Sequence, residues 1–508
     1  MQVISVRPGR PIAIQKAEEV LTWALILILA AGFGIFLAHS ITAIRFPFPL
    51  NYGEGTLLNQ ARLLALGRNI YQPDLTDYPY TITEYPPIYV TMLALSIKHF
   101  GLSYAVGRTL SAIAALVSAA SIVLILYMLT GDKVASAIGG LLFLAFPYVL
   151  CWSSLVRVDL VALCFSLAGI LVVARWPRER WSPFVSAALM TGAAFTRQSY
   201  LLAGPLTVAG WLFLQNRKKA WMFALSLVAG TLIPFGGLNA LTGGGFFFHT
   251  VTANVQGFSL SELIRFFTHL VGTSAPLLAI AVVELMAAVR RQRSASPLPS
   301  LFFLGGFLSA LTIGKVGADI NYFLELLAAL SLVTGAAVAR WRRSSRDSWA
   351  RPILLALLAL QMLWLLQFAR FYTHGVELRI QMRPELEKLE RLVEEEAGPI
   401  LADEYMGLLV MNEREVLLRP FHFTQLARQG RWDQSRLVAD MRARRFSLIL
   451  VSDQPPLFRE ALVRSRWTQE MWAAIQEAYE PTQVLAGTTV YRPRGRGDHG
   501  AGRPFAIR

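Results

Sequence analysis

The chain has 508 residues, of which 54% are hydrophobic and only 16% are charged, and its mean hydropathy is +0.46. Soluble domains carry about 25% charged residues, so this composition excludes an ordinary soluble enzyme and indicates lipid as the solvent. The net charge of +15 invites a nucleic-acid interpretation, but its distribution argues against one, because 27 basic and 14 acidic residues occur up to residue 351, against 21 and 19 beyond it.

Apolar segments of spanning length recur along the first 370 residues. A membrane-spanning helix needs about 20 mostly apolar residues. Eleven segments are candidates, several of them short: 20–44, 107–130, 134–152, 159–175, 183–197, 199–214, 221–241, 270–289, 299–314, 320–339 and 352–369. Basic clusters such as Arg217/Lys218/Lys219 occur at every second connection, as expected of cytoplasmic loops. The pattern predicts an α-helical, multi-pass protein of the cytoplasmic membrane, with residues 1–19 inside and the region after 370 outside.

The first outward loop, residues 45–106, carries its own structural signals. Thr56–Gly67 has helical periodicity, with Thr56 as a possible N-cap and Gly67 at its end. Tyr71–Pro87 is rich in Tyr, Pro, Asp and Thr, which indicates an irregular but ordered segment. Ile88–Phe100 is apolar but too short to span, so we expect a re-entrant or interfacial helix.

Beyond residue 375 the composition becomes that of a soluble domain. Strand patterns alternate with helical patterns there, which predicts a small α/β domain over 375–493 outside the membrane. The expected helices are Pro384–Glu396 and segments near 433–445 and 468–479, and the expected strands are Pro399–Ala402, Val416–Arg419, Phe446–Ser452 and Val484–Tyr491. Residues 494–508, rich in Gly and Arg, are expected to be a disordered tail.

Glu54 is the first candidate for chemistry. It lies in Asn51-Tyr52-Gly53-Glu54-Gly55, about ten residues past the end of the first span. The flanking glycines allow a tight turn and close approach of a substrate. A carboxylate at a partly desolvated membrane surface can act as a general base. The alternative is a solvated loop acid that caps the following helix.

Two further acidic motifs lie on the outward side. In Glu84-Tyr85-Pro86-Pro87-Ile88 the prolines fix the backbone, which would place Glu84 and Tyr85 at a defined point on the membrane surface. The alternative is a helix-entry turn with an incidental acid. Asp159 follows Arg157 at the start of the fourth span, and charges near the hydrocarbon pair or face a polar cavity. These two residues either neutralise each other or line the same pocket as Glu54.

Two basic sites complete the candidates. Arg197, in Thr196-Arg197-Gln198-Ser199, occupies a junction of two short spans, where its guanidinium can bind phosphate or extend to lipid headgroups. Polar residues interrupt the apolar sequence in 314–325, and broken backbone at membrane depth needs a surrounding protein wall or watery cavity. Lys315 is suited to meet a phosphate, while Asp319, Asn321 and Glu325 are suited either to meet hydroxyl groups or to brace neighbouring residues.

These motifs resemble those of the GT-C class of integral-membrane glycosyltransferases over about residues 15–340. The resemblance lies in their order, their spacing and their common location on the outward side of the membrane. The resemblance is strongest to glycosyltransferase family 39, also called RgtA/B/C/D-like, with the dolichyl-phosphate-mannose and lipid A aminoarabinose transferases. That class uses polyprenyl-phosphate sugars and has a catalytic acid in its first outward loop, where this chain has Glu54. Its aminoarabinose transferases have an acid before Lys-Pro-Pro-Leu, to which Glu84–Ile88 is similar, with Tyr85 replacing the lysine. Asp159 and Arg197 resemble their acid and phosphate-contacting lysine at corresponding positions.

The resemblance implies transfer of a sugar from a polyprenyl-phosphate donor to a hydroxyl of a lipid, glycan or protein acceptor, on the outer face of the membrane. Glu54 would deprotonate that hydroxyl, which attacks with inversion, while Arg197, helped by Lys315 or Arg157, stabilises the leaving phosphate. The chain lacks the adjacent Asp-Glu pair of the protein O-mannosyltransferases, so protein acceptors are less strongly implied. No cofactor is required; a divalent metal would be compatible, but no ligand cluster with recognisable spacing occurs.

Two other functions would also suit a polytopic chain. A transporter or flippase of a lipid-linked or anionic substrate would place charges in an intramembrane cavity, with broken helices at the midplane in matching halves. In this chain the polar residues gather toward one face, and no internal repeat is evident. A non-enzymatic membrane anchor for the C-terminal domain would leave the outward acids and the interrupted segment near Lys315 without explanation.

Overall fold

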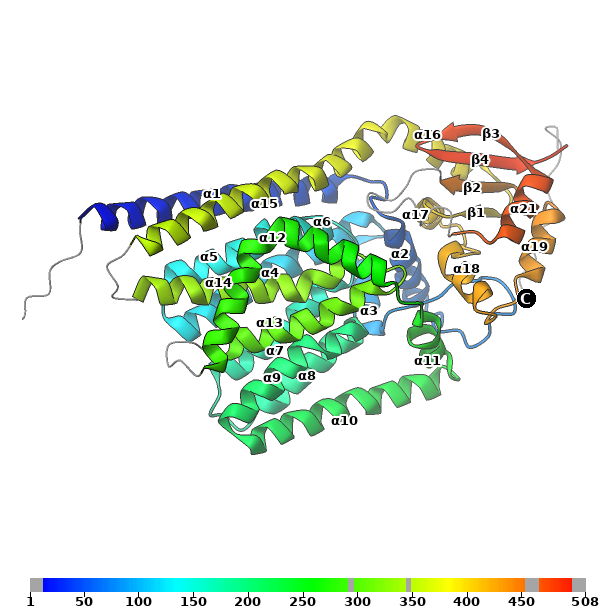
Figure 1. The fold of residues 1–508 in the computed structure, drawn as a ribbon. Helices are drawn as coiled ribbons and strands as arrows, with labels where there is room; N and C mark the ends of the chain where they lie inside the picture. Colours follow the sequence, from blue (N-terminus) through cyan, green and yellow to red (C-terminus); the bar gives the residue numbers. More distant parts are fainter. Residues whose placement is uncertain (1–11, 291–296, 344–348, 453–465, 496–508) are drawn as a thin grey trace, which may run out of the picture.

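The computed structural model describes residues 12–290, 297–343, 349–452 and 466–495. A bundle of long helices has a small sheet with short helices at one end (Figure 1). The helices of the bundle and its connections are α1 (Ile12–Arg45), α2 (Tyr52–Ala65), α3 (Pro87–Phe100), α4 (Tyr104–Thr130), α5 (Lys133–Ala145), α6 (Pro147–Ser153), α7 (Asp159–Arg175), α8 (Ser182–Thr196), α9 (Ala203–Gln215), α10 (Arg217–Leu241), α11 (Gly245–Thr250), α12 (Leu260–Val289), α13 (Pro297–Ala310), α14 (Leu324–Arg343) and α15 (Ala350–Gln381).

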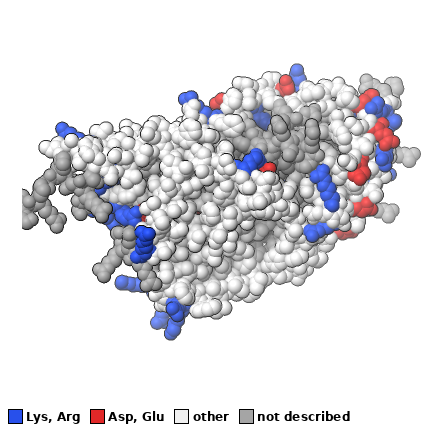
Figure 2. All heavy atoms as spheres, in the orientation of Figure 1, with Lys and Arg blue, Asp and Glu red and all other residues white. Residues whose placement is uncertain are grey.

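The bundle is that of a multi-pass membrane protein. Among the described helices seven are long and apolar enough to cross a membrane, or eight if the bent pair α5–α6 forms one span. Each of the eleven predicted segments is helical, but α7, α8 and α9 have only 17, 15 and 13 residues. Figure 2 shows a broad belt without charged side chains, and Lys and Arg predominate at the end far from the sheet. A charge-free belt is what a hydrocarbon environment requires.

Three predicted boundaries in the membrane region were wrong. The span expected over 134–152 bends by 64° between α5 and α6, because Pro147 lacks an N–H and forces the preceding residue out of helical geometry. The helix expected to be capped by Thr56 begins at Tyr52 with Asn51 as its N-cap, so Glu54 lies in its first turn. The span expected at 270–289 is the second part of the longer α12.

The C-terminal domain is built on a four-stranded sheet with the order β1-β2-β4-β3. Strands β1 and β2 are parallel, and β4 is antiparallel to both β2 and β3. Its elements are α16 (Arg383–Glu395), β1 (Ile400–Ala402), α17 (Met406–Met411), α18 (Pro420–Arg428), α19 (Ser435–Arg442), β2 (Leu448–Ser452), α21 (Gln469–Ala478), β3 (Tyr479–Leu485) and β4 (Thr488–Pro493).

Two strand predictions in this domain need correction. Val484–Tyr491 is not one strand, because a turn at Ala486 and Gly487, both with positive φ, separates β3 from β4. Val416–Arg419 does not join the sheet; instead Leu418 bridges to Tyr80 of the first loop. Most of the tail expected to be disordered, from residue 496 onward, lies outside the described residues.

The C-terminal domain packs on the first loop so closely that the two share a hydrophobic core. Tyr78, Tyr80 and Ile82 of the loop belong to the same buried cluster as Phe423 and Ile449 of the domain. Helices α2 and α17 also contact each other through backbone atoms, at a glycine in each helix. A Cβ added to Gly55 of α2 would lie 2.6 Å from the Cα of Gly407 in α17. The domain is therefore docked by packing, not only tethered by α15.

This close approach predicts that Gly55→Ala destabilises the docked domain. The added methyl would meet backbone atoms that cannot give way, so we expect a loss of about 1–3 kcal/mol in the free energy of unfolding. In the control Gly236→Ala, on α10, the methyl meets nothing within 4 Å, and stability should be unchanged or slightly higher. Chemical unfolding in detergent measures both, and equal stability of the two variants would contradict the docking contact.

Candidate functional site

A cavity of about 300 Å³ lies where the helical bundle, the first loop and the C-terminal domain meet. The first loop, the α6–α7 connection, the junction after α8 and the interrupted segment after α13 supply its walls, and Phe421, His422 and Arg466 of the C-terminal domain close it. Its charged lining residues are Glu84, Arg157, Arg197, Lys315, Asp319 and Arg466. A pocket with few convergent polar groups from several elements is the usual form of a ligand site.

Glu54 does not line this cavity, and its carboxylate is fully engaged elsewhere. It is buried with 0% of its surface exposed and forms a capping box with Asn51. Both of its oxygens accept hydrogen bonds: from Arg108 at 2.8 and 2.9 Å, and from the backbone N–H groups of Leu50, Asn51 and Val156 at 2.7, 3.3 and 2.9 Å. The Glu54 carboxylate therefore binds groups of the protein itself, and it lies outside the lining of the cavity.

Arg108 of α4 is the partner that explains the burial of Glu54. Its guanidinium is also completely buried and donates to the carbonyls of Ala43, Phe46 and Phe48 at 2.6–2.7 Å. A buried ion pair is tolerated only when hydrogen bonds satisfy the remaining donors and acceptors, and these carbonyls do so. The pair thereby connects the end of α1, the start of α2 and the start of α4.

Arg157 and Lys315 are the cations in the cavity wall that lack an ion-pair partner among the described residues. Arg157 donates to the side chain of Asn51, and its guanidinium lies 5.8 Å from the ring centre of Tyr52 and 5.6 Å from that of Trp152. Its Nε has no hydrogen-bond partner there. Because a buried unpaired charge is costly, two such cations in one cavity indicate a site for an anion.

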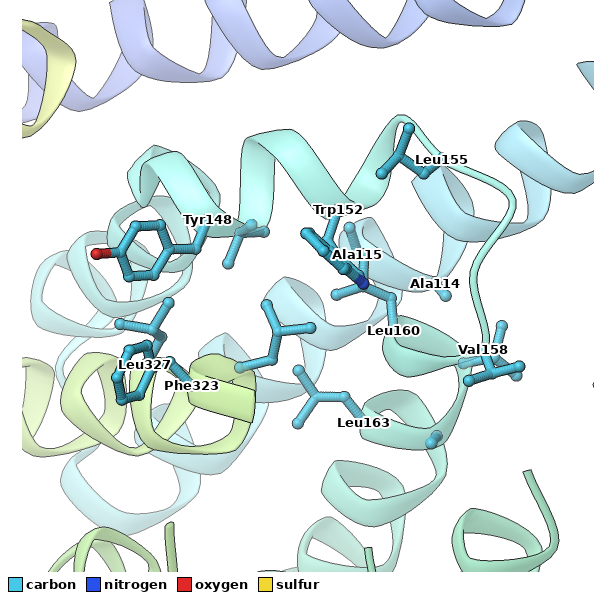
Figure 3. Close-up of a cluster of buried hydrophobic side chains, with 14 of the residues drawn as sticks. Ala114, Ala115, Tyr148, Trp152, Leu155, Val158, Leu160, Leu163, Phe323 and Leu327 are labelled. Carbon is cyan, nitrogen blue, oxygen red and sulfur yellow. The ribbon is translucent and has the colours of Figure 1, made fainter. Parts of the chain in front are cut away.

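The Arg157–Asp159 pair considered from the sequence does not form, because Asp159 binds Arg197. Asp159 also accepts from the Trp152 indole at 2.9 Å and from the Asn321 amide at 2.8 Å, just behind the cavity wall. Figure 3 shows Trp152 of α6 packed among Ala115 and Leu160, so its indole is held in place by the bundle. The charge of Arg197 is thus neutralised by Asp159.

The C-terminal domain neutralises Glu84. Arg419 Nη2 donates to Glu84 Oε1 at 2.7 Å, and His422 Nε2 donates to Oε2 at 2.6 Å. Burial would raise the pKa of Glu84, but the Arg419 guanidinium and His422 hold that pKa well below its usual range. Burial and the same guanidinium lower the pKa of His422, so its imidazole is neutral at pH 7. Glu84 is therefore a stable anion and a weak base.

Arg466 completes the wall from the C-terminal side. It pairs with Glu404 at 2.6 Å and lies 5.3 Å from the ring centre of Tyr52, the ring that Arg157 also contacts. Several lining residues have a buried polar atom without a hydrogen-bond partner in the described structure: Arg157 Nε, Gln198 Oε1, Asn321 Oδ1, His422 Nδ1 and Arg466 Nη1. Buried polar atoms normally have partners, so this set indicates a polar ligand.

The structure brings together most of the residues singled out in the sequence. Glu84, Tyr85, Arg157, Arg197, Lys315, Asp319 and Asn321 all line the cavity, Asp159 lies behind it, and Glu54 lies outside it. Sequence reasoning missed Tyr52, Trp152, His422 and Arg466. Trp152 and Tyr52 lie within a few residues of motifs already noted, but no local pattern in the soluble domain marks His422 or Arg466.

The cavity does not resemble a metal centre. No group of three or more His, Cys, Asp or Glu side chains that could bind a metal ion occurs in the ranges that the structure describes. Its two lining carboxylates stand among four cationic side chains, and hard divalent cations require several oxygen ligands.

Comparison with known proteins identifies the fold. No family model and no curated protein matches the sequence. The structure is similar to ArnT from Cupriavidus metallidurans, a lipid A aminoarabinose transferase, in the apo state (TM-score 0.64, 12% identity) and bound to undecaprenyl phosphate (TM-score 0.60, 14% identity), each covering 92% of this chain and 97% of ArnT. It is also similar to the Archaeoglobus fulgidus oligosaccharyltransferase in complex with Zn and sulfate (TM-score 0.55, 14% identity), covering 92% of this chain and 73% of that one. The fold is therefore that of the GT-C membrane glycosyltransferases.

The engagement of Glu54 predicts that Glu54→Gln acts mainly through stability. The substitution breaks a buried ion pair and leaves the charge of Arg108 uncompensated. Such a change typically lowers the free energy of unfolding by about 3–5 kcal/mol. We expect about the lower end of that range, because the three carbonyls that accept from Arg108 remain. Glu387→Gln breaks an exposed pair with Arg383 and should change stability by less than about 1 kcal/mol. Unfolding measurements on both variants provide the check. A Glu54→Gln protein of wild-type stability that had lost turnover would restore Glu54 as the base.

Proposed function

We propose that the protein is a membrane glycosyltransferase that moves a sugar from a polyprenyl-phosphate donor to a hydroxyl acceptor, at the membrane face on which the C-terminal domain lies. By the charge bias of the loops this is the extracytoplasmic face of the cytoplasmic membrane. The observation that carries the proposal is the cavity with two cations, Arg157 and Lys315, that have no ion-pair partner in the described residues. The GT-C fold supports it, as does the undecaprenyl phosphate in the ArnT structure.

In this proposal Arg157 and Lys315 bind the phosphate of the donor. A phosphodiester carries one negative charge, and the leaving polyprenyl phosphate gains a second one as the bond to the anomeric carbon breaks. Two cations therefore interact more strongly with the transition state than with the bound donor, which is the condition for lowering the barrier. Arg197, neutralised by Asp159, supports the wall and contributes less charge than the sequence suggested.

The base is assigned by comparing the carboxylates near the cavity. Glu54 is sequestered by five donors, Asp159 is bound by Arg197, Trp152 and Asn321, and Glu84 has a strongly lowered pKa. Only Glu84 and Asp319 among the described carboxylates line the cavity, and Asp319, in the interrupted segment after α13, accepts from the Ile320 N–H at 2.7 Å with its Oδ1. We assign the role of general base to Asp319, which takes the proton of the acceptor hydroxyl. The hydroxyl oxygen then bonds to the anomeric carbon with inversion, and the electron pair of the cleaved C–O bond leaves with the phosphate.

A transporter or flippase remains the second function to test. It would require broken helices at the bilayer midplane in corresponding halves of the chain. The charged lining residues instead gather at the end of the bundle that the C-terminal domain covers, where a lipid headgroup can be reached from the membrane surface. This placement favours chemistry on the headgroup.

The base assignment is tested by turnover of polyprenyl-phosphate sugars by the purified protein. Asp319→Asn should lower the rate of sugar transfer or release by at least about 10²-fold, the usual contribution of a general base, with donor affinity little changed. Wild-type turnover in Asp319→Asn would remove Asp319 from the mechanism. Absence of transfer or release with every donor, together with transmembrane movement of one of them in proteoliposomes, would favour the transporter.

The phosphate assignment predicts weaker binding of polyprenyl phosphate in Arg157→Gln and Lys315→Gln. A hydrogen bond to a charged group contributes about 1.5–3 kcal/mol, so each loss should weaken affinity about 10-fold or more. The control is Arg265→Gln, since Arg265 is 48% exposed, pairs with Glu262 and is absent from the cavity wall. Binding titrations measure all three variants. Equal affinities would place the phosphate elsewhere.

A further inference from the structure

Three side chains of the cavity wall have an acceptor atom without a hydrogen-bond partner in the ranges that the structure describes: Gln198 Oε1, Asn321 Oδ1 and His422 Nδ1. In both amides the donor end is already held by the protein. The Gln198 amide donates to the carbonyls of Glu84 and Thr250 at 2.9 and 3.1 Å. The Asn321 amide donates to the Asp159 carboxylate at 2.8 Å. These bonds fix the orientation of each amide, so its oxygen remains as an acceptor.

His422 is the acceptor that the C-terminal domain brings to the cavity. Its side chain is 3% exposed, and its Nε2 lies 2.6 Å from Glu84 Oε2. Because an ionised carboxylate only accepts hydrogen bonds, Nε2 carries the proton of this contact. Burial and the charge of Arg419 lower the pKa of His422, which keeps the ring neutral at pH 7. A neutral imidazole protonated at one nitrogen has a lone pair on the other, so Nδ1 is a fixed acceptor.

We propose, resting on the proposed function, that His422 Nδ1 accepts a hydrogen bond from a hydroxyl group of the donor sugar, and that this contact makes the C-terminal domain a determinant of sugar specificity. Gln198 Oε1 and Asn321 Oδ1 accept from further hydroxyl groups of the same ligand. A phosphodiester and a polyprenyl chain have no N–H or O–H group to donate to these three atoms. A polyhydroxylated ring has several, so the sugar is the part of the donor that matches them.

His422 lies near the cation that the proposed function assigns to the donor phosphate. After burial and Arg419, the charge of Lys315 also contributes to lowering the pKa of His422, so the two side chains are within electrostatic reach of each other. Helix α18 packs against the segment that carries Lys315, since a Cβ added to Gly317 would lie 3.0 Å from Phe421 Cζ. In a polyprenyl-phosphate sugar the sugar is bonded directly to the phosphate. A phosphate held by Lys315 therefore brings its sugar, rather than the lipid chain, beside His422.

The affinity of the donor is measured by competition against a fluorescent polyprenyl monophosphate on the purified full-length protein. The probes are polyprenyl-monophosphate glucose, mannose and arabinose, and the single-deoxy analogues of the sugar that binds most tightly. Polyprenyl methyl phosphate, a diester of the same charge without a sugar, is the reference. In the native protein the deoxy analogue that lacks the hydroxyl bound by His422 should bind about 10-fold or more weakly than its parent, because a buried acceptor loses its donor.

His422→Gln separates the contact with the sugar from the contact with Glu84. The Gln Nε2 replaces the imidazole Nε2 and keeps the bond to Glu84, but no acceptor remains at the position of Nδ1. This variant should bind that deoxy analogue and its parent equally, and it should bind the methyl diester as the native protein does. In the matched variant His422→Asn the amide oxygen lies near the position of Nδ1 and the bond to Glu84 is lost, so part of the discrimination should remain.

The possible outcomes separate the inference from the proposed function. Unchanged deoxy ratios in a His422→Gln protein that binds the methyl diester normally, or equal loss of discrimination in both variants, overturn the role of His422. A native protein that binds the methyl diester but binds no sugar more tightly also overturns it, while the assignment of the phosphate remains. If neither the methyl diester nor any of the sugars displaces the probe, the proposed function itself fails.

Discussion

The buried ion pair between Glu54 and Arg108 is the constraint on which the geometry of the site depends. Two full charges with no exposed surface are tolerable only with complete hydrogen bonding. Five N–H groups donate to the Glu54 carboxylate, and three backbone carbonyls accept from the Arg108 guanidinium. Because those groups come from α1, α2, α4 and the α6–α7 connection, the pair fixes how four separate segments meet. The N–H of Val156, one of the donors, immediately precedes Arg157.

The Glu54–Arg108 pair fixes the position of Arg157, because the neighbouring Val156 N–H donates to Glu54. Gly53 leaves room for the Arg157 side chain, because a Cβ at position 53 would lie 2.6 Å from the Arg157 guanidinium carbon. The guanidinium lies against Tyr52 and Trp152, and it has no ion-pair partner among the residues that the structure describes. The motif around Glu54 therefore supports a cation in the cavity wall, and the proposed function assigns the donor phosphate to that cation.

The C-terminal domain also forms part of the cavity wall and contacts the first loop. Its Arg419 and His422 neutralise Glu84, its Arg466 contacts Tyr52, and its Leu418 bridges to the first loop. The cavity exists only where the membrane domain, the loop and this domain are in contact, so binding and docking are energetically linked. Any ligand that contacts both walls also stabilises the docked state.

Hydropathy and loop charge predicted the polytopic bundle, because the hydrocarbon requirement acts on every span and leaves a strong pattern. The small α/β domain was predicted by alternation, but Val416–Arg419 was misassigned because a strand pattern does not specify its partner. The surroundings of Glu54 could not be predicted for a similar reason: the sequence shows an acid between glycines but not Arg108, 54 positions later. His422 and Arg466 could not be found at all, since their place in the cavity results from domain docking.

The most direct test of this account is an experimental structure of the protein with polyprenyl phosphate bound. The account predicts phosphate density between the side chains of Arg157 and Lys315, with the polyprenyl chain leaving the cavity toward the membrane and the C-terminal domain docked over Glu84. Phosphate density bound elsewhere, with Arg157 and Lys315 still facing an empty cavity, would contradict it.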